Sequence, residues 1–421
     1  MLTPEDCSVP ESEPPTIVFS STVDIRRLFL NGSSYPGNSS VSPLHTQALE
    51  FDHRNQTLCY IHQNESVKAT LSCSHIDDLS SAWDLPSPAM FPLDSMTHIA
   101  LDWISSNWYF LDDNREMVFL CNSTLASCVI LIDVNLSKPR GIALDPTKGL
   151  MFFTKWGAST PMLERALLDG TNRTSLVNRK IVYPYGVTVD FPTQHVYWVD
   201  TYLDFVERVD YDGRHRRTIK KGFPCRRIDF ERNLFLVFSH LERADKFRWP
   251  VLKRKLCGSI GGHPARRSKV NLGVHILFTE AISGGDIVTH TLPLPQPSLH
   301  ILIAESECTH HLYQAVVHLQ VQNLYDITIF ENNLFMTSWR NESIIRLDKY
   351  QSDNHETVAN FSRPFAIHVY HRQRQPDVWH PCKEHNGLCD HICIPAWKRN
   401  VFVVQCLCQA GYRLSRGGQC L

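Results

Sequence analysis

The sequence lacks an excess of charge of either sign, since 42 Lys and Arg residues stand against 43 Asp and Glu and leave a net charge of −1. No basic run is long enough to neutralise a row of phosphates, which argues against nucleic acid as a partner. The chain also lacks any apolar run of the roughly 18–20 residues that a membrane-spanning helix needs. Its 421 residues, 43% of them hydrophobic, instead fit one large globular domain with one or two small ones.

The first residues, Met1 to Cys7, lack the positive and apolar segments of a secretory signal peptide. Cysteines and sequons nevertheless indicate an extracellular protein. Six of the 14 cysteines fall in the last 40 residues, a density typical of small secreted modules. Nine Asn-x-Ser/Thr sequons are predicted glycosylation sites: Asn31, Asn38, Asn55, Asn64, Asn122, Asn135, Asn172, Asn341 and Asn360. We therefore expect a piece of a longer chain, with the signal peptide and transmembrane helix outside it and Met1 an internal methionine.

A repeat runs through the middle of the chain. Its units open at 99–102, 142–145 and 187–190, and their closing aspartates are 43 and 45 residues apart. Each opening alternates apolar and polar residues like a half-buried strand, and an aromatic, β-branched strand follows it. A third strand ends at an Asp-Gly turn in two of the units, and no unit shows helical spacing of apolar residues. Four antiparallel strands at this spacing predict the blades of a β-propeller.

Weaker copies of the unit at 48–62 and 327–338 raise the count to five. The segment 17–30 resembles the second and third strands of a blade, and 366–370 resembles a first strand. Joined, the two ends of the chain would complete a sixth blade and leave no open sheet edge. We therefore predict an all-β chain with a six-bladed propeller followed by a small disulfide-rich module.

One stretch breaks the repeat, because the unit after Asp190 lies 140 residues further on, at Phe330. The excess, about 223–320, contains none of the sequons, eight of the 21 histidines and an odd set of three cysteines, Cys225, Cys257 and Cys308. We expect a non-native or disordered insert, with an ordered extra element as the alternative. The predicted domains are the remnant of an upstream module (1–15), the propeller (16–222 and 321–378), the insert (223–320) and the terminal module (379–421).

The terminal module contains Cys382, Cys389, Cys393, Cys406, Cys408 and Cys420, for which fifteen pairings are possible. Zinc is the rival interpretation, but zinc sites prefer paired Cys knuckles and an oxidising compartment favours disulfides. In the propeller, Cys121 and Cys128 lie across a predicted hairpin, and Cys59 and Cys73 flank another. Each of these pairs could form a disulfide or remain as free thiols, and Cys7 has no assigned partner.

These features resemble two known modules. The cysteine spacing with Gly411-Tyr412 is similar to an epidermal growth factor (EGF)-like module, which implies the pairs Cys382–Cys393, Cys389–Cys406 and Cys408–Cys420. The blades resemble the YWTD propeller of the low-density lipoprotein receptor family, and Tyr197-Trp198-Val199-Asp200 is the fullest match to its signature. The resemblance covers about three quarters of the chain and includes the family's order of propeller then EGF-like module. Its signature positions are Tyr109, Asp112, Phe152, Phe153, Tyr197, Trp198 and Asp200.

The resemblance implies that the chain is part of a larger single-pass endocytic receptor and lies on the extracellular side of the plasma membrane and in endosomes. It would bind extracellular proteins such as lipoproteins or protease–inhibitor complexes and release them in acid. The signature aspartate, which is structural in the family, is replaced by Lys155, His62 and Ser338 in three units, so we expect weaker blade contacts there. Residues 377–381 lack the ligands of calcium-binding EGF-like modules, so no calcium is expected.

Catalysis is not expected, and no cofactor or metal site is predicted. Asp102, Asp145 and Asp190 could converge on a metal as in propeller hydrolases, but each stands where aspartate commonly caps a turn. No nucleophile elbow or zinc-protease motif is present. The alternatives are a Wnt-co-receptor-like or nidogen-like docking propeller and then a hydrolase. Exposed aromatics on one face would favour docking, and an acidic channel would favour the enzyme.

Acid-dependent release suggests a histidine switch, since imidazole titrates between neutral and endosomal pH. The candidates are His195, His368 and His371, which lie in the predicted propeller. The alternative for each is an ordinary exposed or core histidine.

Overall fold

The computed structural model describes residues 13–37, 40–41, 46, 48–62, 69–88, 91–157, 160–221, 276–281, 287–290, 301–304, 315–316, 324–339, 341–350, 355–398, 401–415 and 419–421. By its contacts the chain divides into Pro224–Val321 and a larger unit formed by the rest. The larger unit contains six four-stranded antiparallel sheets, which are the six predicted blades.

The blades, each named from its inner to its outer strand, have these bounds. Blade 1 is β28 (Ile367–Tyr370), β1 (Thr16–Ser20), β2 (Ile25–Phe29) and β3 (Ser40–Val41); blade 2 is β4 (Ala48–Asp52), β5 (Thr57–His62), β6 (Thr70–His75) and β7 (Asp78–Asp84). Blade 3 is β8 (Met96–Asp102), β9 (Asn107–Asp112), β10 (Met117–Cys121) and β11 (Cys128–Ile132); blade 4 is β12 (Pro139–Asp145), β13 (Leu150–Lys155), β14 (Met162–Leu167) and β15 (Thr174–Val177). Blade 5 is β16 (Pro184–Asp190), β17 (His195–Asp200), β18 (Phe205–Asp210) and β19 (Arg217–Lys221); blade 6 is β24 (Leu324–Phe330), β25 (Asn333–Ser338), β26 (Ser343–Asp348) and β27 (His355–Asn360).

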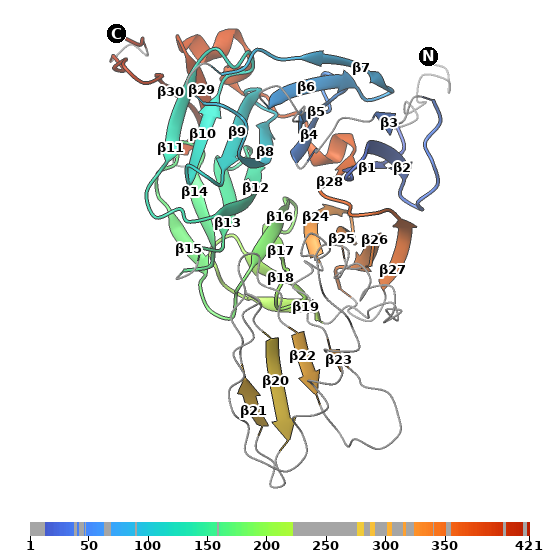
Figure 1. Cartoon of the computed structure of the whole chain (residues 1–421). Helices are drawn as coiled ribbons and strands as arrows, with labels where there is room; N and C mark the ends of the chain where they lie inside the picture. Colours follow the sequence, from blue (N-terminus) through green and yellow to red (C-terminus); the bar gives the residue numbers. More distant parts are fainter. Residues whose placement is uncertain are drawn as a thin grey trace, which may run out of the picture. The chain divides into compact units, whose positions relative to one another are not determined.

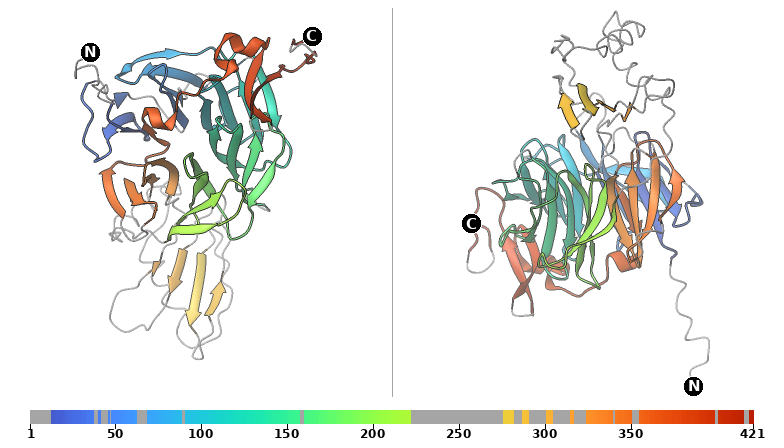
Figure 2. Two further views of the ribbon diagram at one scale, coloured as in Figure 1. Left: turned by 180° about the vertical axis from the view of Figure 1, so that it is seen from behind. Right: turned by 90° about the horizontal axis from the view of Figure 1, so that it is seen from below.

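The blades form a closed ring. Figure 1 views this ring roughly along its axis, and Figure 2 views it from behind and from the side. The inner strands contact one another in the order β28, β4, β8, β12, β16, β24 and back to β28. Burial decreases from the inner to the outer strands of the blades. Every residue of the inner strands β8 and β16 is buried, whereas the outer strands β15 and β27 are partly exposed. Blade 1 combines strands from both chain ends, which confirms the predicted closure and hides the strand edges.

The smaller unit lies in the sequence between β19 and β24, so it interrupts a connection between blades and leaves each blade whole. Its described residues form one sheet in the order β21-β20-β22-β23, in which β20 and β22 are parallel. The bounds are β20 (Ile276–Ala281), β21 (Ile287–His290), β22 (Ile301–Ala304) and β23 (Ala315–Val316). The predicted nature of this stretch stays a prediction, and Cys225, Cys257 and Cys308, like Cys7, lie outside the described residues.

A short module follows the propeller and the single turn η2 (Arg372–Arg374). It consists of η3 (Pro381–Lys383), η4 (His385–Leu388) and the hairpin β29 (Ile392–Lys398) and β30 (Val401–Leu407). Three disulfides hold it together, Cys382–Cys393, Cys389–Cys406 and Cys408–Cys420, which are the pairs that the EGF-like resemblance implies. Two more disulfides, Cys59–Cys73 and Cys121–Cys128, join residues that face each other on adjacent propeller strands.

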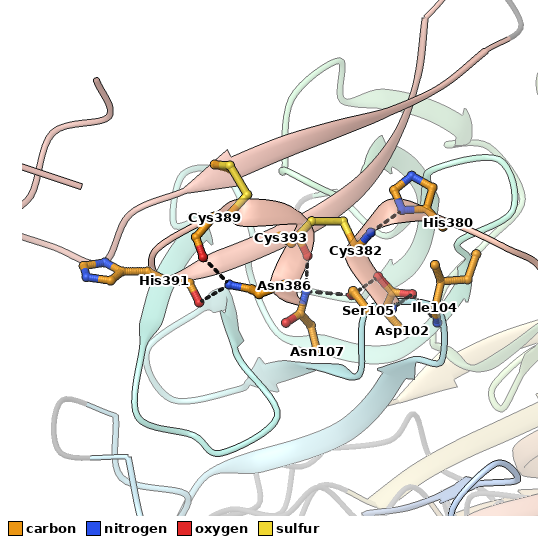
Figure 3. The surroundings of a disulfide bond; sticks show 11 residues. Asp102, Ile104, Ser105, Asn107, His380, Cys382, Asn386, Cys389, His391 and Cys393 are labelled. Atoms are coloured by element: carbon orange, nitrogen blue, oxygen red, sulfur yellow. Dashed lines mark hydrogen bonds between the residues drawn. A yellow bond between two sulfur atoms is a disulfide. The ribbon is translucent and has the colours of Figure 1, made fainter. Parts of the chain in front are cut away.

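The EGF-like module is packed against blades 3 and 4. Ile392 and Ile394 join the apolar cluster that includes Tyr109 of β9. In Figure 3, the Asn107 amide of the propeller donates to the Cys393 carbonyl and to Ser105 Oγ, both at 2.7 Å. Ser105 Oγ in turn donates to Asp102 Oδ2 at 2.5 Å. The module and the propeller therefore share one core and one hydrogen-bond network.

Within the part of the chain that the structure describes, no helix has the length and apolarity that crossing a bilayer requires.

Candidate protein-binding site

Two strand ends of each blade meet at one face of the ring. The start of an inner strand pairs with the end of the second strand, as Pro139 does with Lys155, Pro184 with Asp200 and Leu324 with Ser338. Residues at the start of an inner strand, and residues that follow the end of a second strand, therefore lie on the same side of every blade. We call this side the entry face.

Aromatic residues at the entry face of blades 4 to 6 and of the link to β28 form a continuous group. We call it the aromatic belt: Trp156, Tyr183, Tyr185, Tyr202, Tyr325, Trp339 and Phe365. Trp156 meets Tyr183 edge-on with ring centroids 4.8 Å apart, and Tyr183 meets Tyr202 at 5.5 Å. Further along, Tyr325 stacks on Trp339 at 4.9 Å. The belt connects because Arg140 lies over both the Trp156 and Tyr185 rings, 5.3 and 5.1 Å from their centroids.

The members of the belt differ in burial. Tyr185 and Phe365 are buried, four members are half-buried, and Tyr202 is 56% exposed. Trp, Tyr and Arg are the residues most enriched where protein interfaces derive their binding energy. The belt thus has the composition of a protein-docking surface, although only Tyr202 among its members is exposed, whereas the sequence analysis set a face of exposed aromatics as the sign of docking.

The signature aspartate of blade 5 positions the exposed end of the belt. Asp200 accepts hydrogen bonds from the backbone N–H groups of Val182 (2.7 Å), Tyr183 (3.2 Å), Tyr202 (3.1 Å) and Leu203 (2.9 Å). Burial raises its pKa, and these four bonds counter that rise in part. One carboxylate therefore fixes the two segments that present Tyr183 and Tyr202.

Other signature positions are structural as well. The aromatic ones are fully buried, and the Tyr109 hydroxyl donates to the Leu168 carbonyl of blade 4 at 3.0 Å. Asp112 accepts from the N–H groups of Asn114 and Arg115, as Asp200 does in blade 5. At the corresponding place in blade 4, Lys155 Nζ donates to the Asn135 carbonyl, on the link from blade 3, at 2.7 Å. The departure from the signature therefore replaces an acceptor with a donor and still joins two blades.

The three repeat aspartates act at turns, as the sequence analysis favoured over a metal site. Asp102 accepts from the Ile104 and Ser105 N–H groups. Asp145 accepts from the Thr147 hydroxyl, and Asp190 accepts from the Thr193 hydroxyl.

The propeller axis has a mixed lining. Inner strands surround a cavity of about 50 Å³ whose charged or titratable lining residues are Glu50, His98, Asp326, His368 and Arg374. Burial raises the pKa of Glu50 to about 8, so this carboxyl is largely neutral at pH 7. Two imidazoles and a guanidinium accompany the two carboxyls, which differs from the acidic channel expected of a hydrolase.

The three pH-switch candidates lie apart. His368 is in the axis, where burial lowers its pKa to about 3, so it stays neutral at endosomal pH. His195, on blade 5, pairs with Asp210 at 3.1 Å. His371 accepts from the Gln373 N–H at 3.2 Å and caps η2. Burial lowers the pKa of both His195 and His371.

Seven of the nine sequon asparagines lie among the described residues. Asn31, Asn55, Asn135, Asn172 and Asn360 are exposed, and Asn122 and Asn341 are half-buried. Asn38 and Asn64 lie outside the described residues. Occupancy of these sites stays a prediction.

Comparison with known proteins places the chain beside receptors. It is 25% identical over 323 residues to the vitellogenin receptor Yl of Drosophila melanogaster and 22% identical over 300 residues to the vitellogenin receptor of Solenopsis invicta. These matches cover 77% and 71% of this chain, which spans only 11% of each relative. A chain in the crystal structure of a nidogen/laminin complex has a TM-score of 0.53 at 16% identity, covering 84% of this chain and 98% of that one. No family model matches the chain.

Both curated relatives are named as receptors, and the structural neighbour supports the six-bladed propeller fold.

Proposed function

We propose that this chain is the ligand-binding propeller and EGF-like module of an endocytic receptor of the low-density lipoprotein receptor family. The observation that carries the proposal is the aromatic belt, a partly exposed cluster of Trp, Tyr and Arg on a closed ring. The ligand class is an extracellular lipoprotein, because both receptor relatives are named for vitellogenin. Protease–inhibitor complexes are a second class from the same family resemblance. The narrower resemblance, to the amino-proximal propeller of low-density lipoprotein receptor-related protein 1, stays a prediction.

The rigid link between the propeller and the EGF-like module supports a role as a spacer as well. Trp397 Nε1 of β29 donates to the Thr147 carbonyl of blade 4, and Gln405 Nε2 of β30 donates to Asp169 at 2.6 Å. Contacts at both strands of the hairpin resist rotation of the module, so a ligand on the propeller would keep a fixed distance from the next module of the receptor.

The test measures binding of purified vitellogenin to the immobilised full chain by surface plasmon resonance. Tyr202→Ala removes the most exposed belt residue, and the matched control is Tyr350→Ala, since Tyr350 is 55% exposed and follows β26 at the opposite end of its blade. We expect Tyr202→Ala to weaken binding at least about fivefold, the effect of losing a residue worth about 1 kcal/mol. Equal affinities for the two variants would overturn the belt as the binding surface, and no binding by the unaltered chain would overturn the lipoprotein ligand.

Acid-dependent release is the finer part of the proposal, and its candidates are His195 and His371. Replacing both by Gln slows release at about pH 5.5 if their protonation drives it. Unchanged release rates would leave them as ordinary framework histidines.

A further inference from the structure

Three side chains from three blades converge at the propeller axis. His98 of β8, Asp326 of β24 and His368 of β28 each offer one ligand atom, and these atoms lie within 4.8 Å of one another. All three line the axial cavity. In zinc sites His nitrogens and carboxylate oxygens bind about 2.0–2.2 Å from the ion and therefore stand about 3.4 Å from one another, so pairs of this set would have to close by up to about 1.4 Å to coordinate an ion.

The burial and hydrogen bonding of the three groups point to a ligand. His98 is 6% exposed and Asp326 is 2% exposed. His368 Nε2 is buried and has no hydrogen-bond partner, an arrangement that costs free energy unless something binds there. The Asp326 carboxylate is fixed by the N–H groups of Ile327 (2.8 Å) and Ile367 (3.0 Å), which leaves lone pairs available.

A carboxyl group lies near one of the histidines. Glu50 Oε1 is 3.7 Å from His368 Nδ1, beyond hydrogen-bond distance, and Nε2 is the ring nitrogen without a partner. Metal-binding histidines commonly donate the N–H of their second ring nitrogen to a carboxylate, so a closer approach of Glu50 would orient His368 toward an ion. The nearby guanidinium of Arg374 is held on blade 5, where it donates to the Val189 carbonyl at 3.0 Å and to Thr188 Oγ1 at 3.2 Å.

We infer that His98, Asp326 and His368 form a site for a divalent transition metal that joins blades 1, 3 and 6 at the propeller axis. Two imidazoles and one carboxylate suit Zn²⁺ or Fe²⁺, whereas Ca²⁺ requires six to eight oxygen ligands. The sequence analysis predicted no metal site and did not consider these three residues, which are far apart in the chain. The inference stands independently of ligand docking at the aromatic belt.

The experiment uses Zn²⁺ alone as the probe on the full chain. The protein is stripped with a chelator, dialysed against ZnCl₂, and its bound zinc is counted by mass spectrometry. His98→Gln and His368→Gln are each expected to lose one zinc per chain, whereas the control variants His195→Gln and His371→Gln keep it. The difference between variants is the readout because eight other histidines lie in 223–320.

Two further measurements identify the site. Glu50→Gln should weaken zinc binding about 10–100-fold without changing the number of ions bound at saturation. The absorption spectrum of Co²⁺ bound to the unaltered chain, minus that of Co²⁺ bound to His98→Gln, should lack thiolate charge-transfer bands, because no cysteine belongs to the proposed site. Thermal unfolding in the presence of a chelator checks that each variant folds. If one of the two His variants does not fold, the other still tests the site, because His98 and His368 lie on different strands. Equal zinc content in the unaltered chain and the folded site variants would overturn the inference, and so would thiolate bands in the difference spectrum.

Discussion

The carboxylate of Asp200 offers the sharpest test of how the fold positions its candidate binding surface. Asp200→Ala removes the acceptor of four backbone N–H groups, on segments 182–183 and 202–203. A buried N–H left without a partner costs about 1–3 kcal/mol. Tyr202 is exposed and Val182, Tyr183 and Leu203 are half-buried, so water can replace part of the lost hydrogen bonding. Removing a buried carboxylate whose pKa is raised returns part of this cost, and the net loss expected is about 2–3 kcal/mol.

The assay combines guanidinium unfolding with hydrogen exchange of the peptides that contain the two segments. Asp200→Asn should fall between the unaltered chain and the Ala variant, since an amide oxygen accepts from one segment while the amide N–H₂ faces donors on the other. The control is Asp212→Ala in the same blade, because the Asp212 side chain is half-exposed and, among the described residues, pairs with its near neighbour Arg214. That variant should stay within about 0.5 kcal/mol of the unaltered chain. Unchanged exchange at 182–183 and 202–203 in Asp200→Ala would refute the positioning role.

Three other predictions concern the scaffold. Gly186→Ala should destabilise the propeller by at least about 1–3 kcal/mol in denaturant unfolding, since the new Cβ would lie 2.5 Å from the Asp326 Cα; a smaller loss would show that the inner strands can separate. Burial raises the pKa of Asp102 from 3.8 to about 6, so the native state binds more protons than the unfolded state between these two pH values. The native state therefore gains about 2 kcal/mol of stability from this group as the pH falls from 7 to 4.5. Asp102→Asn should remove this gain from the free energies of unfolding measured at the two pH values, and an unchanged pH dependence would contradict the assignment. Replacing Cys121 and Cys128 by Ala should lower the free energy of unfolding by about 2–3 kcal/mol, the chain-entropy value for the short loop that their disulfide closes. Thermal unfolding of the variant at an unchanged midpoint would contradict this prediction.

Much of the fold could be predicted because its signals are local. Alternating apolar residues and Asp-Gly turns repeat in each blade, and each signal is complete within a few residues. The segment 366–370 was predicted as an inner strand, and β28 spans Ile367–Tyr370. The strands within 223–320 gave no such repeat, and the sequence analysis assigned them no fold.

The sequence does not indicate the aromatic belt or the axial cluster, because each joins residues of different blades that are far apart in the sequence. A signal was nevertheless present in the repeat itself. The third residue of the inner strand is Gly141 in blade 4 and Gly186 in blade 5, where neighbouring backbones approach closely. His98 and Asp326 occupy the same place in blades 3 and 6. Aligning the blades by strand position would have identified both as side chains that point toward the axis.

The contacts that close the ring also hold the base of the candidate binding surface. Thr154 Oγ1 accepts from the Gly141 N–H at 2.9 Å and donates to the Tyr185 carbonyl of the next blade at 2.7 Å. Thr337 Oγ1 likewise donates to the Phe365 carbonyl at 2.7 Å. Tyr185 and Phe365 are the two buried members of the aromatic belt, so hydrogen bonds between blades fix its base. A surface ordered before binding loses little conformational entropy on docking. Variants that loosen blade contacts should therefore weaken ligand binding even when every exposed belt residue is retained.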